Sequence, residues 1–312
     1  MKKWFVLVCA ASLCACAGLN KNTVSYQMSK YDPQVYYVVS GEGANKEAAS
    51  ANALENMQKA LEKTVSETKG LSQINDLVAN AKVSKVWRDK SSKTTKNYFA
   101  LAVLKRANAE KILQPSINEV DAQLGALATQ LKATEDKFTG LRAAFAMQPL
   151  IIKRNTLQDL YVFVGQDHEG YETTRFNQYK RLYNERLAAV KVATIVRGEE
   201  SPVLLSRVVD AINQMGLSTV EGNNPNALLS VEVDAQVDGY GSERIKGLEW
   251  AATSAAVSLR DLQEGATFAR FNVYDRAGTS RRADSLRKSM EGVGGKASTE
   301  IVRRLTEYLK TK

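Results

Sequence analysis

The alternation of apolar and polar positions predicts two α+β regions in this chain of 312 residues. The first region has three segments rich in β-branched and aromatic residues, which are predicted strands: Gln34–Ser40, Val83–Asp89 and Asn97–Lys105. An alanine-rich segment that begins after Asn45, a residue type that caps helices, predicts a helix ending at Gly70. A shorter helix is expected over Leu71–Ala79, and Gly41–Gly43 is expected to form the turn between strand and helix. The predicted order is β-α-α-β-β.

A second region with the same kind of pattern fills the last third of the chain. Its predicted strands are Val190–Arg197, Leu217–Glu221, Ala227–Val237, Trp250–Asp261 and Thr267–Asp275. Its predicted helices are Val203–Met215, Arg281–Met290 and Thr299–Leu309. The order β-α-β-β-β-β-α again indicates an α+β domain.

Between the two regions the apolar period changes to that of a coiled coil. The apolar positions step by three and four residues from Ile117 to Phe145, between Pro115 and Pro149, and Thr134 is the one position of the wrong type. Such a stripe must be covered, and two arrangements are open: another copy of the chain, or a helical return over residues 150–189. We favour the internal hairpin because four large side chains of the return share the spacing: Phe176, Tyr179, Tyr183 and Leu187.

The N-terminus predicts a lipoprotein signal. Lys2 and Lys3 precede the apolar stretch Trp4–Ala15, which is too short to span a bilayer. The sequence Leu-Cys-Ala-Cys at residues 13–16 then places a leucine three residues before Cys16 and a small residue directly before it, as in a lipobox. Cys16 is the expected lipidation site, carrying palmitate-type acyl chains that hold the protein on a membrane. The alternative is an ordinary cleaved signal peptide.

The cysteine content and the net charge support export and indicate anionic surroundings. All three cysteines lie within the first 16 residues, so the processed chain keeps only Cys16 and forms no disulfide. The formal charge is +9, and removing Lys2 and Lys3 with the leader leaves +7. This balance suits anionic surroundings such as phospholipid, lipopolysaccharide or peptidoglycan, and an exported protein is not expected to bind nucleic acid. Ala17, in place of an aspartate, favours the outer membrane.

The sequence offers little for catalysis, and no enzymatic activity, metal or cofactor is expected. His168 is the one histidine and lies in a polar turn, and one histidine without a free cysteine cannot form a zinc site. The glycine-rich stretches Gly41–Lys46 and Gly292–Lys296 do not match a phosphate-binding loop. The densest basic cluster, at residues 281–288, is interpreted as a solvated helix face rather than a binding patch.

Residues 31–112 resemble the lipoprotein-20 family of bacterial outer-membrane lipoproteins. The resemblance consists of the lipobox, a strand entering Gly-x-Gly, the helix NKEAASANALENMQKAL, the strand SKVWRD and the strand YFALAVLKR. It implies a scaffold or assembly role at the cell envelope, with relatives among flagellar accessory proteins, and it brings no catalytic residues. The C-terminal region is similar only in element order to domains of curli-secretion and penicillin-binding-protein-activator lipoproteins.

The expected organisation has five parts: a signal peptide at 1–15, a tether at 16–30, a lipoprotein-20-like α+β domain at 31–112, a helical hairpin at 116–189 and a C-terminal α+β domain at 190–312. The expected function is a structural or assembly lipoprotein, lipid-anchored in the outer membrane and facing the periplasm, which contacts other envelope proteins or itself as a homo-oligomer. The alternative is a regulatory module that binds peptidoglycan or a peptidoglycan synthase.

Overall fold

The structure is a computed structural model that describes residues 21–65, 71–88, 97–199, 201–243 and 247–311. It confirms the mixed α+β class. The chain forms two compact units, and each is described by itself: unit 1 comprises Met1–Asn118 and Asn155–Tyr171, and unit 2 comprises Glu119–Arg154 and Glu172–Lys312. These units divide the central helices between them, and the expected boundaries of the domains stay a prediction.

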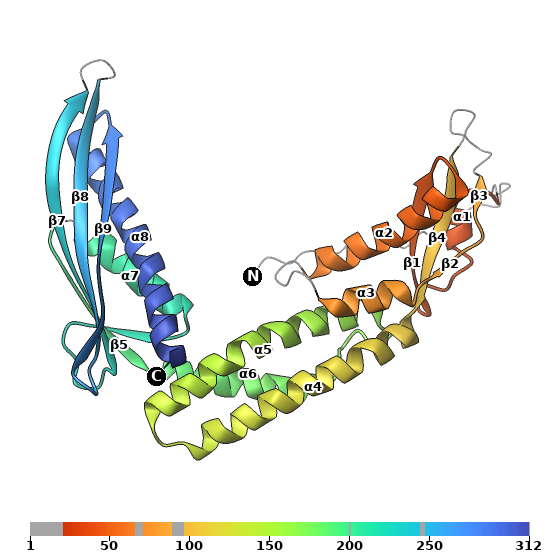
Figure 1. Ribbon diagram of the computed structural model, residues 1–312, viewed down its shortest axis with the longest axis horizontal. Coiled ribbons are helices and arrows are strands. Elements are labelled where there is room, and N and C mark those ends of the chain that lie inside the picture. Colours follow the sequence, from red (N-terminus) through yellow and green to blue (C-terminus); the bar gives the residue numbers. More distant parts are fainter. Residues whose placement is uncertain (1–20, 66–70, 89–96, 200, 244–246, 312) are drawn as a thin grey trace. The chain divides into compact units, whose positions relative to one another are not determined.

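Unit 1 is built on a four-stranded sheet with a long helix on it (Figure 1). Its elements are α1 (Val24–Met28), β1 (Tyr36–Gly43), α2 (Lys46–Thr64), α3 (Ser72–Ala79), β2 (Lys82–Val83), β3 (Trp87–Arg88) and β4 (Tyr98–Lys105). Strand β4 lies at the centre and pairs antiparallel with β1, β2 and β3. The Asn45 side chain caps α2 by accepting a hydrogen bond from the Ala48 N–H at 2.7 Å, as its residue type predicts.

The glycines of β1 have a different role from the expected turn. Strand β1 continues through Gly43 instead of stopping at Ser40, and α2 lies directly against the two glycines. A Cβ at Gly41 would lie 2.1 Å from the Ala53 backbone nitrogen, and a Cβ at Gly43 would lie 2.4 Å from that of Ala49. Glycine is therefore required because the helix backbone approaches the strand more closely than any side chain allows.

Two other expectations for unit 1 need correction. The single strand predicted at Val83–Asp89 is two short strands, β2 and β3, and residue 89 lies outside the described residues. Part of the expected tether at 16–30 is folded, because α1 begins at Val24 and Trp87 Nε1 donates a hydrogen bond to the Asn22 carbonyl at 2.9 Å.

The central helices differ from the predicted continuous stripe. Helix α4 spans Arg106–Ala133 and helix α5 spans Lys137–Val164, so the chain leaves the helix at residues 134–136. Thr134, the one position that broke the heptad pattern, lies in this break. Pro115 was expected to open the helical segment and Pro149 to end it, but each lies inside a helix. Helix α6, at Thr173–Ala188, lies within the predicted helical return.

Unit 2 contains a five-stranded sheet in the order β6-β5-β7-β8-β9. Its elements are β5 (Lys191–Arg197), α7 (Ser201–Gln214), β6 (Ser218–Glu221), β7 (Leu229–Glu243), β8 (Leu248–Asp261), β9 (Ala266–Thr279) and α8 (Arg282–Thr311). The predicted order β-α-β-β-β-β-α is confirmed. Strand β5 pairs parallel with β6 and β7, and the three long strands that follow pair antiparallel.

Helix α8 is one continuous helix, although two were predicted. The Gly292–Gly295 segment, which lies between the two predicted helices, is inside α8 where the helix packs on the sheet. A Cβ at Gly292 would lie 1.8 Å from Asp275 Oδ2 on β9, and a Cβ at Gly294 would lie 3.1 Å from the side chain of Arg207 on α7. These glycines allow close packing of α8 and do not form a phosphate-binding loop.

Candidate functional site

The residues that the sequence singled out do not form a catalytic site. Cys16, the expected lipidation site, lies outside the described residues. His168 is exposed in the turn between α5 and α6, where its Nδ1 lies 3.4 Å from the Val162 carbonyl oxygen. Within the described part of the chain, no group of three or more His, Cys, Asp or Glu side chains could hold a metal ion.

The basic cluster at residues 281–288 is exposed, and two of its members have partners. Arg281 forms an ion pair with Asp284, with Nε and Oδ2 2.7 Å apart. The Arg282 guanidinium carbon lies 3.6 Å from the centre of the Tyr240 ring, which is a cation–π contact between α8 and β7. Of these two, only Arg282 contributes to the attachment of α8 to the sheet.

A buried ion pair joins the central helices within unit 2. Arg154 on α5 is fully buried, and its Nε lies 2.9 Å from Oδ1 of Asp121 on α4, which is 6% exposed. The guanidinium carbon of Arg154 also lies 4.9 Å from the ring centre of Phe176 on α6. Along the expected seam, Val120, Leu124, Leu131, Leu141 and Phe145 are buried within this single chain. This group of contacts is therefore part of a packed core.

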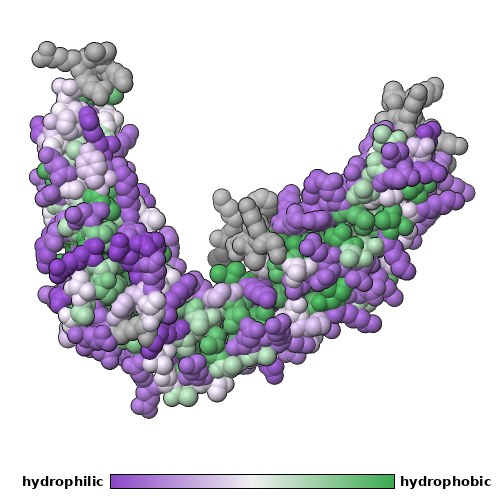
Figure 2. Space-filling model, in the orientation of Figure 1, coloured by the Kyte–Doolittle hydropathy of each residue, from purple (hydrophilic) through white to green (hydrophobic). Residues whose placement is uncertain are grey.

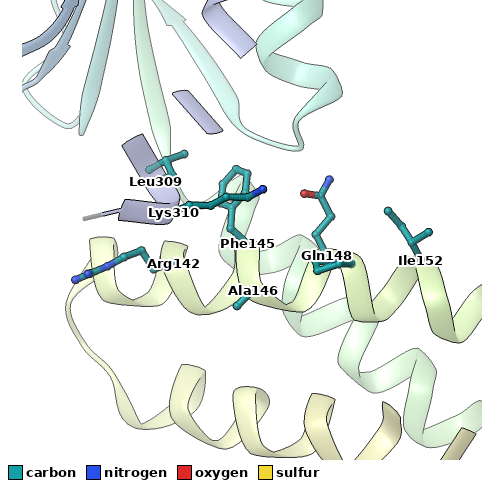
Figure 3. A pocket seen from close by; sticks show the side chains of 8 residues that line it. Arg142, Phe145, Ala146, Gln148, Ile152, Leu309 and Lys310 are labelled. Atoms are coloured by element: carbon teal, nitrogen blue, oxygen red, sulfur yellow. The ribbon is translucent and has the colours of Figure 1, made fainter. Parts of the chain in front are cut away.

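A cavity of about 400 Å³ lies between α5 and the end of α8 within unit 2. Figure 3 shows the side chains of Phe145, Gln148 and Ile152 extending from the same side of α5, with Phe145 next to Leu309 and Lys310 of α8. Arg142 and Lys310 also line this cavity, and no acidic, hydroxyl, thiol or imidazole group does. Its lining therefore provides apolar and cationic contacts but no nucleophile or general base.

The candidate site is instead the face of the second sheet that carries neither α7 nor α8, called here the open face. On β8, alternate side chains from Ala251 to Leu259 are buried toward the helices, and Thr253 Oγ1 lies 2.6 Å from Ser289 Oγ on α8. The intervening residues point to the open face, which is consistent with the period of two in a strand. Figure 2 shows hydrophilic side chains over much of the surface of this unit.

Charged and hydrogen-bonding side chains lie in lines along the strands of the open face. Strand β9 presents four exposed side chains that can donate hydrogen bonds: Arg270, Asn272, Tyr274 and Arg276. Strand β7 presents side chains that can accept them: Glu232, Asp234, Gln236 and Asp238. Tyr274 is 54% exposed, although it is large and aromatic, so this face has the character of a contact surface.

One end of the open face is organised around Trp250. Its neighbours across the sheet are Gly241 on β7 and Gly278 on β9, so no side chain competes with the indole. The indole lies against Gly241, and the Arg276 guanidinium carbon lies 4.0 Å from the centre of its ring system. The guanidinium group of Arg276 stacks with its flat face on the indole. Its N–H groups lie in the guanidinium plane and therefore stay able to donate to a carboxylate or amide oxygen.

Sequence reasoning recognised β9 as a strand but missed this surface. The alternation of polar residues at 270, 272, 274 and 276 was visible, but it does not reveal which side chains of β7 and β8 lie beside them. That information comes from the register of three strands, in which Arg270 pairs with Ser258 and Ser258 pairs with Glu232.

No family model matches the chain, and no curated protein sequence matches it. Among solved structures, it is similar to the secreted protein HP1454 from Helicobacter pylori, at 13% identity and a TM-score of 0.38, over 87% of this chain and 97% of that one. It is also similar to a minor lipoprotein from Acinetobacter baumannii, at 11% identity and a TM-score of 0.29, over 39% of this chain and 94% of that one. Lipoprotein GNA1162 from Neisseria meningitidis matches at 11% identity and a TM-score of 0.25, over 38% of this chain and 99% of that one. At these TM-scores the similarities carry no inference about this chain.

Proposed function

We propose that this chain is a lipoprotein, anchored through Cys16 in the outer membrane, whose folded part faces the periplasm and acts as a scaffold or assembly component of the cell envelope. The observation that carries the proposal is the open face of the second sheet. It presents donor groups on β9 and acceptor groups on β7 over the length of two long strands. Such a surface suits docking, because aligned polar groups select the orientation of a partner.

The N-terminal region supports the anchor. The basic residues, the short apolar stretch and the Leu-Cys-Ala-Cys sequence precede the first described residues, which begin at residue 21. Among the described helices, none is long and apolar enough to cross a membrane. Two or three acyl chains would bind stably, since each buried CH₂ contributes about 0.8 kcal/mol.

Lipidation is tested by replacing Cys16 with serine. We expect the Cys16→Ser protein to take up no label when cells are grown with radioactive palmitate, because it lacks the sulfur that accepts the lipid. The Cys9→Ser and Cys14→Ser proteins are the matched controls and should be labelled like the unchanged protein. Labelling of Cys16→Ser at the level of the controls would refute the lipobox assignment.

A second candidate function is binding of peptidoglycan or of a peptidoglycan synthase. The stack of Arg276 on Trp250 favours it, because aromatic and cationic groups together suit a carboxylated glycan. Co-sedimentation with purified sacculi distinguishes the two functions. A peptidoglycan-binding module should sediment with sacculi and should lose this binding when Trp250 is replaced by alanine. An assembly component that does not bind peptidoglycan should stay in the supernatant.

A further inference from the structure

The register of the second sheet arranges the open face in rows that run across three strands. Each row has one residue on β9, one on β8 and one on β7. The rows are Arg270–Ser258–Glu232, Asn272–Ala256–Asp234, Tyr274–Ser254–Gln236 and Arg276–Ala252–Gly239. Asp238 lies at the irregularity of β7 next to the fourth row, and its Oδ1 accepts a hydrogen bond from Ser254 Oγ at 2.8 Å. Every row therefore has a donor on β9 and an acceptor on or beside β7.

The central strand of the open face carries only small side chains in these rows. Along β8 they are Ala252, Ser254, Ala256 and Ser258, and Ala256 is exposed. Longer side chains stand on both sides of this strip. A flat partner surface can therefore approach β8 closely while the side chains of β7 and β9 meet their counterparts.

We propose that the open face docks against the same face of a second copy of this chain, about a twofold axis parallel to β8. This inference rests on the proposed assembly function and names the partner. A rotation of 180° about that axis places β9 of one copy over β7 of the other and leaves the rows in register. Arg270 then faces Glu232, Asn272 faces Asp234, Tyr274 faces Gln236 and Arg276 faces Asp238 of the other copy. Twofold symmetry makes each of these contacts twice.

Charge selects this axis over the other orientation that brings the two faces together. A twofold axis in the plane of the sheet but perpendicular to the strands would place β9 over β9 and β7 over β7. Glu232, Asp234 and Asp238 would then meet the same acidic strand of the other copy, and Arg270 and Arg276 would meet a basic one. Like charges brought together at an interface cost several kcal/mol, so this orientation is disfavoured.

Some of the acidic groups already have partners, and this limits the strength of the contact. Arg197 Nη1 lies 3.1 Å from Asp234 Oδ1, and Arg260 Nη1 lies 3.7 Å from Glu232 Oε1. The four rows span seven residues of β8, so they cover roughly 14 Å by 24 Å, or about 340 Å² per copy, which is below the usual range for a specific interface. We therefore infer a weak dimer that the lipid anchors strengthen, because confining both copies to one membrane raises their effective concentration.

Cysteine cross-linking at the twofold axis tests the geometry. Residues of β8 face themselves across this axis, and Ala256 is an exposed residue near the middle of the strand. Face-to-face sheets lie about 10 Å apart, which is too far for a direct disulfide. In a full-length chain with Cys9, Cys14 and Cys16 replaced by serine, we therefore expect a bis-maleimide with a spacer of about 10 Å to join the Ala256→Cys chains into a dimer at least about ten times faster than the Ala283→Cys chains, in detergent. Ala283 is exposed on α8 and is the matched control. This chain has no cysteine that can be lipidated, so the outcome of the palmitate-labelling experiment does not affect the cross-linking test.

A charge exchange gives an independent measurement by sedimentation equilibrium. We expect Arg270→Glu or Glu232→Arg alone to weaken dimerisation by at least about tenfold, because each places like charges opposite one another. The double variant should recover the affinity to within about threefold. Equal cross-linking of the two cysteine variants, or failure of the double variant to recover, would overturn the proposal. The proposal would also be overturned if the unchanged chain stays monomeric but binds sacculi, and Arg270→Glu abolishes that binding. This result would assign the face to an anionic glycan.

Discussion

Replacing Asp121 by alanine should lower the free energy of unfolding by about 3–5 kcal/mol. Arg154 is fully buried and its Nε donates to Asp121 Oδ1 at 2.9 Å, so the alanine variant leaves a buried cation without its carboxylate. The Phe176 ring near the guanidinium compensates only in part. Urea denaturation followed by circular dichroism measures the change.

Two further variants separate the ion pair from its surroundings. Glu119→Ala removes an exposed carboxylate from the same helix and should change the free energy of unfolding by less than about 0.5 kcal/mol. The double variant Asp121→Leu with Arg154→Met removes both charges and should cost less than Asp121→Ala alone, because the buried cation is removed together with the carboxylate. A loss below about 1 kcal/mol for Asp121→Ala would show that the buried pair does not hold these helices together.

Replacing Gly41 by valine should destabilise unit 1 by at least about 3 kcal/mol, which is at the upper end for overpacking. A Cβ at this position would lie 2.1 Å from the Ala53 backbone nitrogen, and a backbone atom cannot move aside as the end of a side chain can. Helix α2 would have to separate from the sheet. The expected result is a lower urea midpoint and loss of thermal cooperativity in unit 1.

Ser40→Ala is the matched control for this substitution. Ser40 is the neighbouring residue on β1 and points to the opposite face of the strand, so its change should cost less than about 1 kcal/mol. Equal stability of the Gly41→Val and Ser40→Ala variants would contradict the close contact between β1 and α2.

Strands and their order could be predicted from the sequence, whereas the role of the glycines could not. Segments rich in β-branched and aromatic residues mark β1, β4 and the strands of the second sheet regardless of what covers them. Glycine has two physical uses, to turn the chain and to let another backbone come close, and the two look alike in a sequence. At Gly41 and at Gly292 the second use applies, so the predicted turn and the predicted helix end were both wrong.

The central helices show a similar limit. The three- and four-residue spacing of apolar positions continues across the break at 134–136. Both helices present an apolar stripe, and the stripe of α5 continues the spacing of the stripe of α4. Periodicity reports which residues are buried, but not where the chain reverses. For the same reason the pair formed by Asp121 and Arg154, 33 residues apart, could not be found before the turn between their helices was known.

The central claim is that this chain is a membrane-anchored assembly protein, and chemical cross-linking in intact cells tests it most directly. After cross-linking, membranes are separated on a density gradient and the protein is detected by its size on a denaturing gel. The account predicts that the protein is found with the outer membrane and in species larger than one chain. Recovery of the protein only as a single chain, outside the outer-membrane fraction, would contradict it.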